Sequence, residues 1–192
     1  MFARTPRLLL RPGWIEDAPA LADAINDPAI LRNLPRPPCP YGLSDAEAFL
    51  SLPQDPRLPR LLVFTRTRGA PRLVGGCGVH LNEDGAPELG YWIARPYWGL
   101  GFATEAARAA LCMARAHGVT GIRASHFSDN AASGNVLRKL GFRFTGQVEM
   151  RRSAGRDALV ECRLFEEDEG SGMNDDPAMD LYRDAVMVAE AA

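Results

Sequence analysis

Two glycines stand two residues apart immediately before a predicted helix. This segment, residues 99–104, consists of Gly99, Leu100, Gly101, Phe102, Ala103 and Thr104. The first turn of a helix carries unpaired backbone N–H groups and a partial positive charge. Glycines beside it let the backbone close around an oxyanion such as a phosphate. The pattern therefore predicts a phosphate-binding loop, with a tight turn that holds no ligand as the alternative.

The glycine motifs of other nucleotide-binding proteins do not fit this sequence. GxxxxGK[ST] is absent, which argues against a P-loop NTPase. A second cluster, Gly75-Gly76-Cys77-Gly78, lies inside a predicted strand and begins no helix. Glycines within a strand mark a bulge or a close packing contact, so this cluster does not indicate a dinucleotide fingerprint.

The spacing of cysteines and histidines indicates no metal centre. The residues of these two types are Cys39, Cys77, Cys112, Cys162, His80, His117 and His126. They form neither a CxxC pair nor an HExxH motif. We expect reduced, mostly buried thiols and no metal cofactor.

The bulk composition is typical of a globular protein. The 192 residues are 46% hydrophobic and 24% charged, which suits one domain with a sizeable core. No apolar run approaches the roughly 20 residues that span a bilayer, and the N-terminus has no signal-peptide pattern. We therefore expect a cytoplasmic protein with no membrane partner.

Charge is unevenly distributed along the chain. Residues 166–192 contain nine acids and one base, whereas the rest contains 21 bases and 15 acids. A basic body is compatible with a polyanionic small ligand or with RNA. Aromatic and basic residues do not alternate as they do in RNA-binding motifs, so we expect no nucleic-acid partner.

Hydrophobic periodicity and turn residues predict an α/β (α+β) domain with helices on the faces of a mixed sheet. The predicted strands are 7–11, 61–66, 73–81, 88–94, 121–127, 142–149 and 158–165. The predicted helices are 16–25, 45–52, 103–116 and 131–140. A capping box, with Glu47 reaching back to Ser44, predicts the start of the second helix.

The acidic C-terminal region, residues 166–192, is predicted to be a linker and a helical extension outside the main domain. Met179, Tyr182, Val186 and Ala189 fall at helical spacing. We expect this helix to dock on its own domain or to form a homodimer contact. A solubilising tail without fixed structure is the alternative.

Two motifs together resemble a known family. ELGYWIARPYWGLGFATEA, followed by NAASGNVLRKLGF, is similar to the GNAT acetyltransferases, in the RimJ/RimL branch of ribosomal-protein N-terminal acetyltransferases. LRPGWIEDAPAL, INDP and PYGLSDAEAFL resemble the same branch. The resemblance runs from about Leu8 to Phe165, so residues 1–165 are predicted to form one GNAT domain. It implies an acyl-CoA N-acyltransferase fold: a mostly antiparallel sheet of about seven strands, splayed at its centre, with about four helices.

The resemblance also implies a binding site for acetyl-CoA as a co-substrate. The pantetheine arm would pair with Trp92, Ile93 and Ala94, and the pyrophosphate would lie on the amides of residues 99–104. The family motif Gln/Arg-x-x-Gly-x-Gly/Ala corresponds to residues 98–103, where Trp98 replaces the Gln or Arg. The further cofactor contacts that the resemblance implies are Asn130, Ser133 and either Lys139 or Arg138.

The implied reaction moves an acetyl group to a primary amine, by direct attack through a tetrahedral intermediate. Ser133 would protonate the thiolate, although capping of a helix is its alternative role. Glu88 is the first candidate for the general base, acting through a water, with Glu149 and Glu161 as weaker candidates. Main-chain N–H groups near Trp92 would hold the oxyanion.

Two points stay open at this level. The acceptor is either a protein N-terminus or a small-molecule amine, and three arginines between 151 and 157 are candidates for contacting an acidic acceptor. The alternative to an enzyme is a non-catalytic acyl-CoA-binding sensor or interaction module on the same fold.

Overall fold

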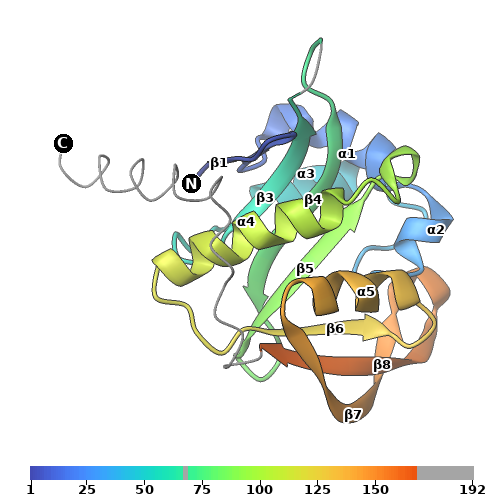
Figure 1. Cartoon of the computed structure of the whole chain (residues 1–192). Helices are drawn as coiled ribbons and strands as arrows, with labels where there is room; N and C mark the ends of the chain where they lie inside the picture. The colour runs from blue at the N-terminus through green and yellow to red at the C-terminus, as the bar shows by residue number, and fades with distance from the viewer. Residues whose placement is uncertain (67–68, 168–192) are drawn as a thin grey trace.

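The computed structural model describes residues 1–66 and 69–167, which form one sheet flanked by helices (Figure 1). The sheet has eight strands in the order β1-β2-β3-β4-β5-β6-β8-β7. The strands are β1 (Ala3–Arg4), β2 (Leu8–Arg11), β3 (Arg60–Thr65), β4 (Leu73–Leu81), β5 (Pro87–Ile93), β6 (Arg123–Phe127), β7 (Phe142–Ser153) and β8 (Ala158–Glu167). Every pair of neighbours is antiparallel except β5 and β6, which are parallel.

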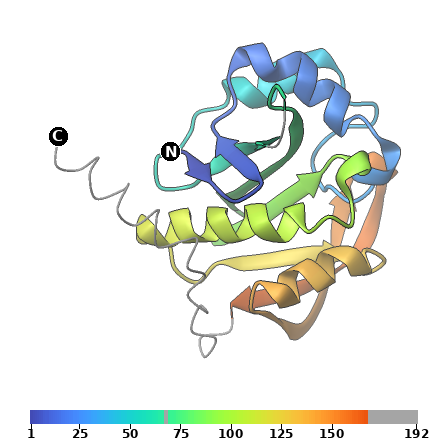
Figure 2. The same cartoon turned by 45° about the horizontal axis from the view of Figure 1, so that its top comes forward.

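Five α-helices and three short 3-10 helices connect the strands. The α-helices are α1 (Ala18–Ile25), α2 (Pro28–Leu31), α3 (Leu43–Ser51), α4 (Phe102–Ala116) and α5 (Ala131–Lys139). The 3-10 helices are η1 (Ile15–Asp17), η2 (Arg95–Tyr97) and η3 (Ala154–Arg156). Helices α4 and α5 lie side by side on one face of the sheet, as both views show (Figures 1 and 2).

The two faces of the sheet are buried by different helices. Alternate residues of β5 divide between them because side chains in a strand point to opposite faces. Leu89 and Ile93 belong to the core under α4, together with alanines of that helix. Trp92 packs against the second core, which α1, α2 and α3 cover. The strand thus contributes side chains to both sides of the sheet.

The sheet is splayed at its centre, as the sequence resemblance implies. The parallel pairing of β5 with β6 covers only Glu88 with Arg123 and Leu89 with Ala124. Beyond these two pairs the strands diverge, although β5 continues to Ile93 and β6 to Phe127. Parallel strands have their carboxyl ends at the same edge, so the helices that follow them, α4 and α5, both begin where the strands diverge.

The structure confirms the predicted fold class and most of the predicted elements, and it corrects several details. The sheet has eight strands rather than about seven, because the two-residue β1 pairs with β2. There are five α-helices in the described residues rather than about four, because the short α2 also forms. Asp27 caps α2, and its Oδ1 accepts from Ala29 N–H at 2.7 Å. Strand β7 extends to Ser153, beyond the predicted end at 149. Its register shifts between Phe144 and Val148, and such an irregularity interrupts the alternation from which strands are predicted.

The predicted capping box of α3 is wrong by two residues. The helix begins at Leu43, after Gly42, rather than at Asp45. Gly42 N–H donates to Asp45 Oδ2 at 2.8 Å, so Asp45 fills the position predicted for Glu47. Both residues are acidic and stand at the start of the helix, which is why the sequence pattern did not separate them.

Two further points concern what the described residues include. The predicted C-terminal extension lies outside them, apart from Glu166 and Glu167, which end β8. Within residues 1–66 and 69–167, no helix is both long enough and apolar enough to cross a membrane.

Candidate functional site

The glycine loop before α4 has the backbone conformation that its sequence suggests. Gly99 has φ of 76° and Gly101 has φ of 80°, a left-handed region that side chains disfavour. A Cβ at Gly99 would meet no atom within 4 Å. Both glycines are exposed. The loop thus needs glycine for its turn and leaves open space on its outer side.

The loop also presents unpaired backbone donors. Glu105 N–H donates to Gly101 O at 3.1 Å, which is the first bond of α4. Among the described residues, the N–H groups of residues 99–104 have no hydrogen-bond acceptor. A series of free amides at a helix N-terminus is the arrangement that binds phosphate, so the donor set fits the pyrophosphate of a coenzyme A.

The main chain of β5 alternates between its two neighbours. Ala94 N–H donates to Val74 O at 2.8 Å, toward β4. By the alternation of an antiparallel ladder, Ile93 and Tyr91 point their main-chain groups the other way, toward the divergence. Trp98 Nε1 donates to Ile93 O at 2.6 Å, which agrees with this direction. The indole of Trp98 thereby occupies one acceptor position of the Ile93 carbonyl.

The N-terminus of α5 brings three polar groups together beside β5. Asn130 precedes the helix, and its Oδ1 accepts from Ser133 N–H at 3.2 Å. The hydroxyl of Tyr91 lies 2.8 Å from Ser133 Oγ and 3.1 Å from Ser133 O. Burial raises the pKa of Tyr91, so its hydroxyl stays protonated. Asn130 caps the helix, and Tyr91 holds the Ser133 hydroxyl in place.

Lys139 lies away from this cluster. It is the last residue of α5 and is exposed, while Asn130 stands before the first. Nine helical residues rise about 13 Å at about 1.5 Å each. The two views show α4 and α5 beginning at the same end, so Lys139 lies at the end of α5 opposite to the glycine loop (Figures 1 and 2).

Glu88 lies where β5 and β6 are still paired, just before the two strands diverge. Its side chain is buried in an ion pair. Its Oε1 accepts from Ser125 Oγ at 2.5 Å and from Arg151 Nη1 at 2.9 Å. Its Oε2 lies 3.2 Å from the same Arg151 nitrogen. The side chains of Glu88 and Arg151 are 9% and 29% exposed. Both carboxylate oxygens already have donors, so a water that Glu88 activates would have to share them.

His80 lies directly opposite Glu88, on β4. Its ring faces Gly90, where an added Cβ would lie 3.5 Å from Cε1 and 3.7 Å from Nδ1. Burial, and to a lesser degree Arg36, lowers the pKa of His80. A neutral imidazole can accept a proton, and this one shares a face of the sheet with Glu88 and Trp92. No motif in the sequence marked His80, because only strand pairing brings it to Glu88.

The remaining acid and base candidates have partners within the chain. Glu149 Oε2 accepts from Arg151 Nε at 3.3 Å, and Glu161 Oε1 accepts from Ser128 Oγ at 2.6 Å. Arg151 lies inside β7 rather than in a loop. Arg152 pairs with Asp157. Arg156 pairs with Asp129 at 2.8 Å.

No metal site accompanies these residues. In the part of the chain that the structure describes, no three His, Cys, Asp or Glu side chains are grouped to hold an ion. All four cysteines are free thiols, and two of them, Cys77 and Cys162, are buried.

A family model described as "Acetyltransferase (GNAT) domain" matches residues 7–143. The chain therefore belongs to the GNAT acetyltransferase family and is an acetyl-CoA-dependent N-acetyltransferase, as the resemblance in the sequence predicted. Two curated relatives are an uncharacterized N-acetyltransferase p20 from Bacillus licheniformis and an uncharacterized N-acetyltransferase YoaA from Bacillus subtilis (strain 168). The p20 protein is 26% identical over 84% of this chain and 92% of its own length. YoaA is 30% identical over 74% of this chain and 82% of its own length.

A solved structure of RimL, the ribosomal L7/L12 alpha-N-protein acetyltransferase, in complex with coenzyme A shares the fold. It superposes with a TM-score of 0.71 at 19% identity, covering 88% of this chain and 99% of that one. The likeness supports the splayed sheet described above.

Proposed function

We propose that this chain transfers an acetyl group from acetyl-CoA to a primary amine by direct attack of the amine on the thioester, through a tetrahedral intermediate. The observation that carries the proposal is the set of unpaired amides at residues 99–104, next to the diverging strands β5 and β6. Family membership supplies the reaction class. RimL, which shares the fold, is known in complex with coenzyme A, which supports the choice of co-substrate.

The proposal assigns the parts of acetyl-CoA to separate elements. The pyrophosphate lies on residues 99–104, and the pantetheine arm follows the free edge of β5 at Trp92, Ile93 and Ala94. Asn130 contacts the arm from the start of α5. Lys139 is proposed to contact the adenosine phosphates from the far end of that helix.

Ser133 is proposed as the group that protonates the leaving thiolate. Its hydroxyl lies at the start of α5 and bonds to Tyr91, and these contacts would fix its direction. A thiol has a pKa of about 8.5, so the thiolate leaves readily and an acid adds a modest factor. The main-chain N–H of Ile93, which points away from β4, would stabilise the oxyanion.

Glu88 is proposed as the general base, acting through a water. It shares a face of the sheet with Trp92, the face that α1, α2 and α3 cover, and the proposal requires the amine to reach it from that side. His80 is a second candidate because it faces the same side and its pKa is lowered by burial. Substitution of each residue by glutamine, followed by a measurement of turnover, separates the two candidates.

The acceptor is proposed to be a protein N-terminus or a small amine. RimL acts on an alpha-N-protein acceptor, ribosomal L7/L12, which favours the first class. The arginines Arg151, Arg152 and Arg156 already pair with carboxylates of the chain, so they give little support to an acidic acceptor. The free cysteines support the prediction of a reducing, cytoplasmic compartment.

Calorimetric titration with acetyl-CoA tests the proposal. Wild type is compared with G101E, which adds a side chain and a negative charge where the φ is +80°. G118E is the matched control, because Gly118 has φ of +77° and open space but follows α4 at its other end. Wild type and G118E should bind and G101E should not. A folded wild type that binds no acetyl-CoA would refute the proposal.

The alternative that the sequence left open, a sensor that binds acyl-CoA without transferring it, conflicts with membership of the N-acetyltransferase family. It predicts the same titration but no acetylation of any peptide or amine in a mass-spectrometric screen. Acetylated product that forms with the wild type would exclude this alternative, and slower formation with S133A would tie the product to the proposed site.

A further inference from the structure

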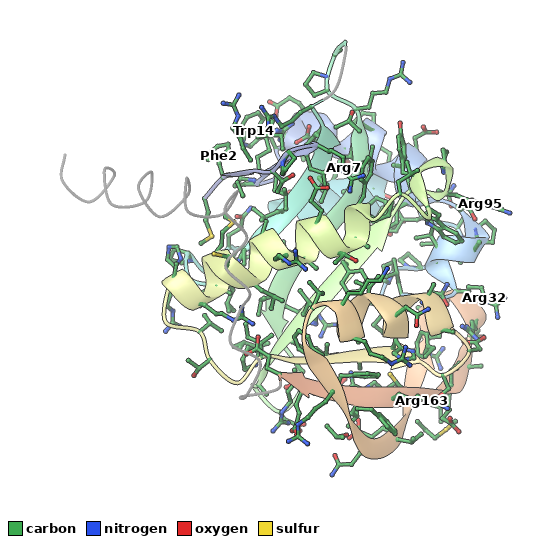
Figure 3. The ribbon with its side chains drawn as sticks, viewed as in Figure 1. Phe2, Arg7, Trp14, Arg32, Arg95 and Arg163 are labelled. Carbon is green, nitrogen blue, oxygen red and sulfur yellow. The ribbon has the colours of Figure 1, made fainter. Side chains whose placement is uncertain are left out.

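Arg7 attaches the glycine loop to the segment between β1 and β2. Its Nη1 donates to Leu100 O at 2.8 Å, and its guanidinium carbon lies 4.8 Å from the centre of the Phe102 ring. A Cβ at Gly101 would lie 3.5 Å from Arg7 Nη2. The guanidinium therefore contacts the residues before and after the left-handed glycine. Figure 3 shows Arg7 above the N-terminal half of α4.

Glu105 completes this attachment from the first turn of α4. Its Oε2 accepts from Arg7 Nε at 2.7 Å and pairs with Arg7 Nη2 at 2.7 Å. Its Oε1 accepts from Thr5 Oγ1 at 2.5 Å and from Arg7 N–H at 3.0 Å. The side chain of Glu105 is 15% exposed and that of Arg7 is 44% exposed. Four donors from the segment between β1 and β2 thus engage one carboxylate.

The bond to Leu100 determines how the next amide points. In a trans peptide the C=O and the N–H point in opposite directions. Because Leu100 O points at Arg7, Gly101 N–H points away from it, and this N–H is one of the unpaired amides of the loop. A cation at the carbonyl also polarises the peptide, which makes its N–H a better donor to an anion.

The contacts of Glu105 also change the charge of the site. A carboxylate in the first turn of a helix can accept the free N–H groups itself and repels a bound phosphate. Here both oxygens are engaged by Thr5 and Arg7, so the amides stay free and the negative charge is balanced.

We propose that Arg7 is a positioning residue of the coenzyme A site, which orients the Gly101 amide and neutralises Glu105 while leaving the loop amides free for the pyrophosphate. The inference rests on the proposed function, since it takes coenzyme A as the ligand. In this proposal Arg7 acts through Leu100 and Glu105 rather than by contact with the cofactor. Its effect is on cofactor affinity, and a role only in holding the fold would not produce that effect.

The test measures the Kd for coenzyme A in calorimetry, with the melting temperature of each variant recorded. R7Q should weaken binding about tenfold or more, because it loses the bond to Leu100 and leaves Glu105 uncompensated. R7Q/E105Q should bind more tightly than R7Q, since the charge is removed. R66Q is the matched control, because Arg66 Nη1 donates to Thr5 O at 2.6 Å in the same segment. It should bind like wild type.

The outcomes separate the two proposals. If wild type does not bind coenzyme A, the proposed function fails. If wild type binds and R7Q binds within twofold of it, or R66Q loses as much as R7Q, the inference about Arg7 fails. A double variant no tighter than R7Q refutes the neutralisation of Glu105. Where R7Q does not fold, R7K takes its place, and it should lose several-fold because a single ammonium cannot bond Leu100 and Glu105 together.

Discussion

The hydroxyl oxygen of Tyr91 lies 2.8 Å from Oγ of Ser133, and the two residues come from the central strand β5 and the start of α5. Tyr91 and Ser133 are 42 positions apart in the sequence. The pair connects a strand that faces the divergence to the helix that begins there. The Tyr91 hydroxyl thus gives Ser133, the proposed acid, a hydrogen-bond partner on the sheet.

The first prediction concerns this pair. S133A should lower turnover by about ten- to a hundredfold, since it removes the proposed acid, while the affinity for acetyl-CoA changes little. Y91F should lower turnover less, because Ser133 keeps its hydroxyl but loses an orienting partner. Steady-state kinetics with an amine that the wild type acetylates measures both. Unchanged turnover in S133A would leave the Ser133 hydroxyl with its bond to Tyr91 and no part in the reaction, and S51A, at the end of helix α3, is the control.

The second prediction concerns the ion pair of Glu88 and Arg151. E88Q removes the shorter and more buried of the two ion pairs of Arg151 and leaves it only Glu149 at 3.3 Å, so we expect a loss of about 2 kcal/mol in the free energy of unfolding. Urea denaturation measures this loss. The double variant E88Q/R151M should be more stable than the sum of the two single variants predicts, because the two charges are coupled.

The turnover of E88Q and that of H80Q distinguish the two candidates for the general base. If Glu88 is the base, E88Q should lose far more activity than H80Q at equal acetyl-CoA affinity. The reverse order would transfer the role to His80, and equal small losses would exclude both.

The third prediction concerns pH. Burial lowers the pKa of His80 and of His126 below the ordinary 6.5. Below pH 6.5 the unfolded chain therefore binds more protons than the folded chain, so stability is complete above that pH and falls as the pH drops through it. Asp17 and Asp129 have lowered pKa values, and their contribution is lost only near pH 4 and below.

Urea midpoints at pH 7.5 and pH 5.5 check this prediction, because that window excludes the two aspartates. Wild type should be less stable at pH 5.5, and H80Q should lose less between the two values. An equal loss in wild type and H80Q would show that His80 does not contribute.

The fourth prediction concerns Gly134 in α5. Alanine within a helix is normally stabilising relative to glycine. Here a Cβ would lie 2.7 Å from His126 Nε2, so G134A should lower stability by about 1–3 kcal/mol. N135A, at the next and exposed position, should change stability by less than about 0.5 kcal/mol. The pair G134A/H126A should lose less than the two single changes combined, and simple additivity would contradict the contact.

The sequence predicted the elements whose signals are local. Gly101 and the alanines after it locate the start of α4 to within one residue, because a glycine turn and a long periodic helix are both short-range patterns. The four-residue helix α2 was missed, although its Asp-Pro start was present, because four residues show no periodicity.

The sequence did not predict contacts between distant segments. Arg7 meets Glu105 across 98 positions, and Arg151 meets Glu88 across 63. Charges of opposite sign are frequent in the chain, so no pattern selects these pairs. The site residues that came from motifs lie along β5 and on the loops and helices α4 and α5 that follow β5 and β6, whereas Arg7 and His80 take their places only through the order of the strands.

The short pairing of β5 with β6 has a consequence for amide hydrogen exchange. Protection in a sheet normally increases from the outer strands to the inner ones. Tyr91 and Ile93 lie on a central strand, yet their N–H groups point to the divergence, where no strand of the described residues accepts them. Without a ligand these amides should exchange at rates typical of an outer strand, while those of Gly90 and Trp92, turned to β4, exchange slowly. The middle of this sheet therefore contains an edge.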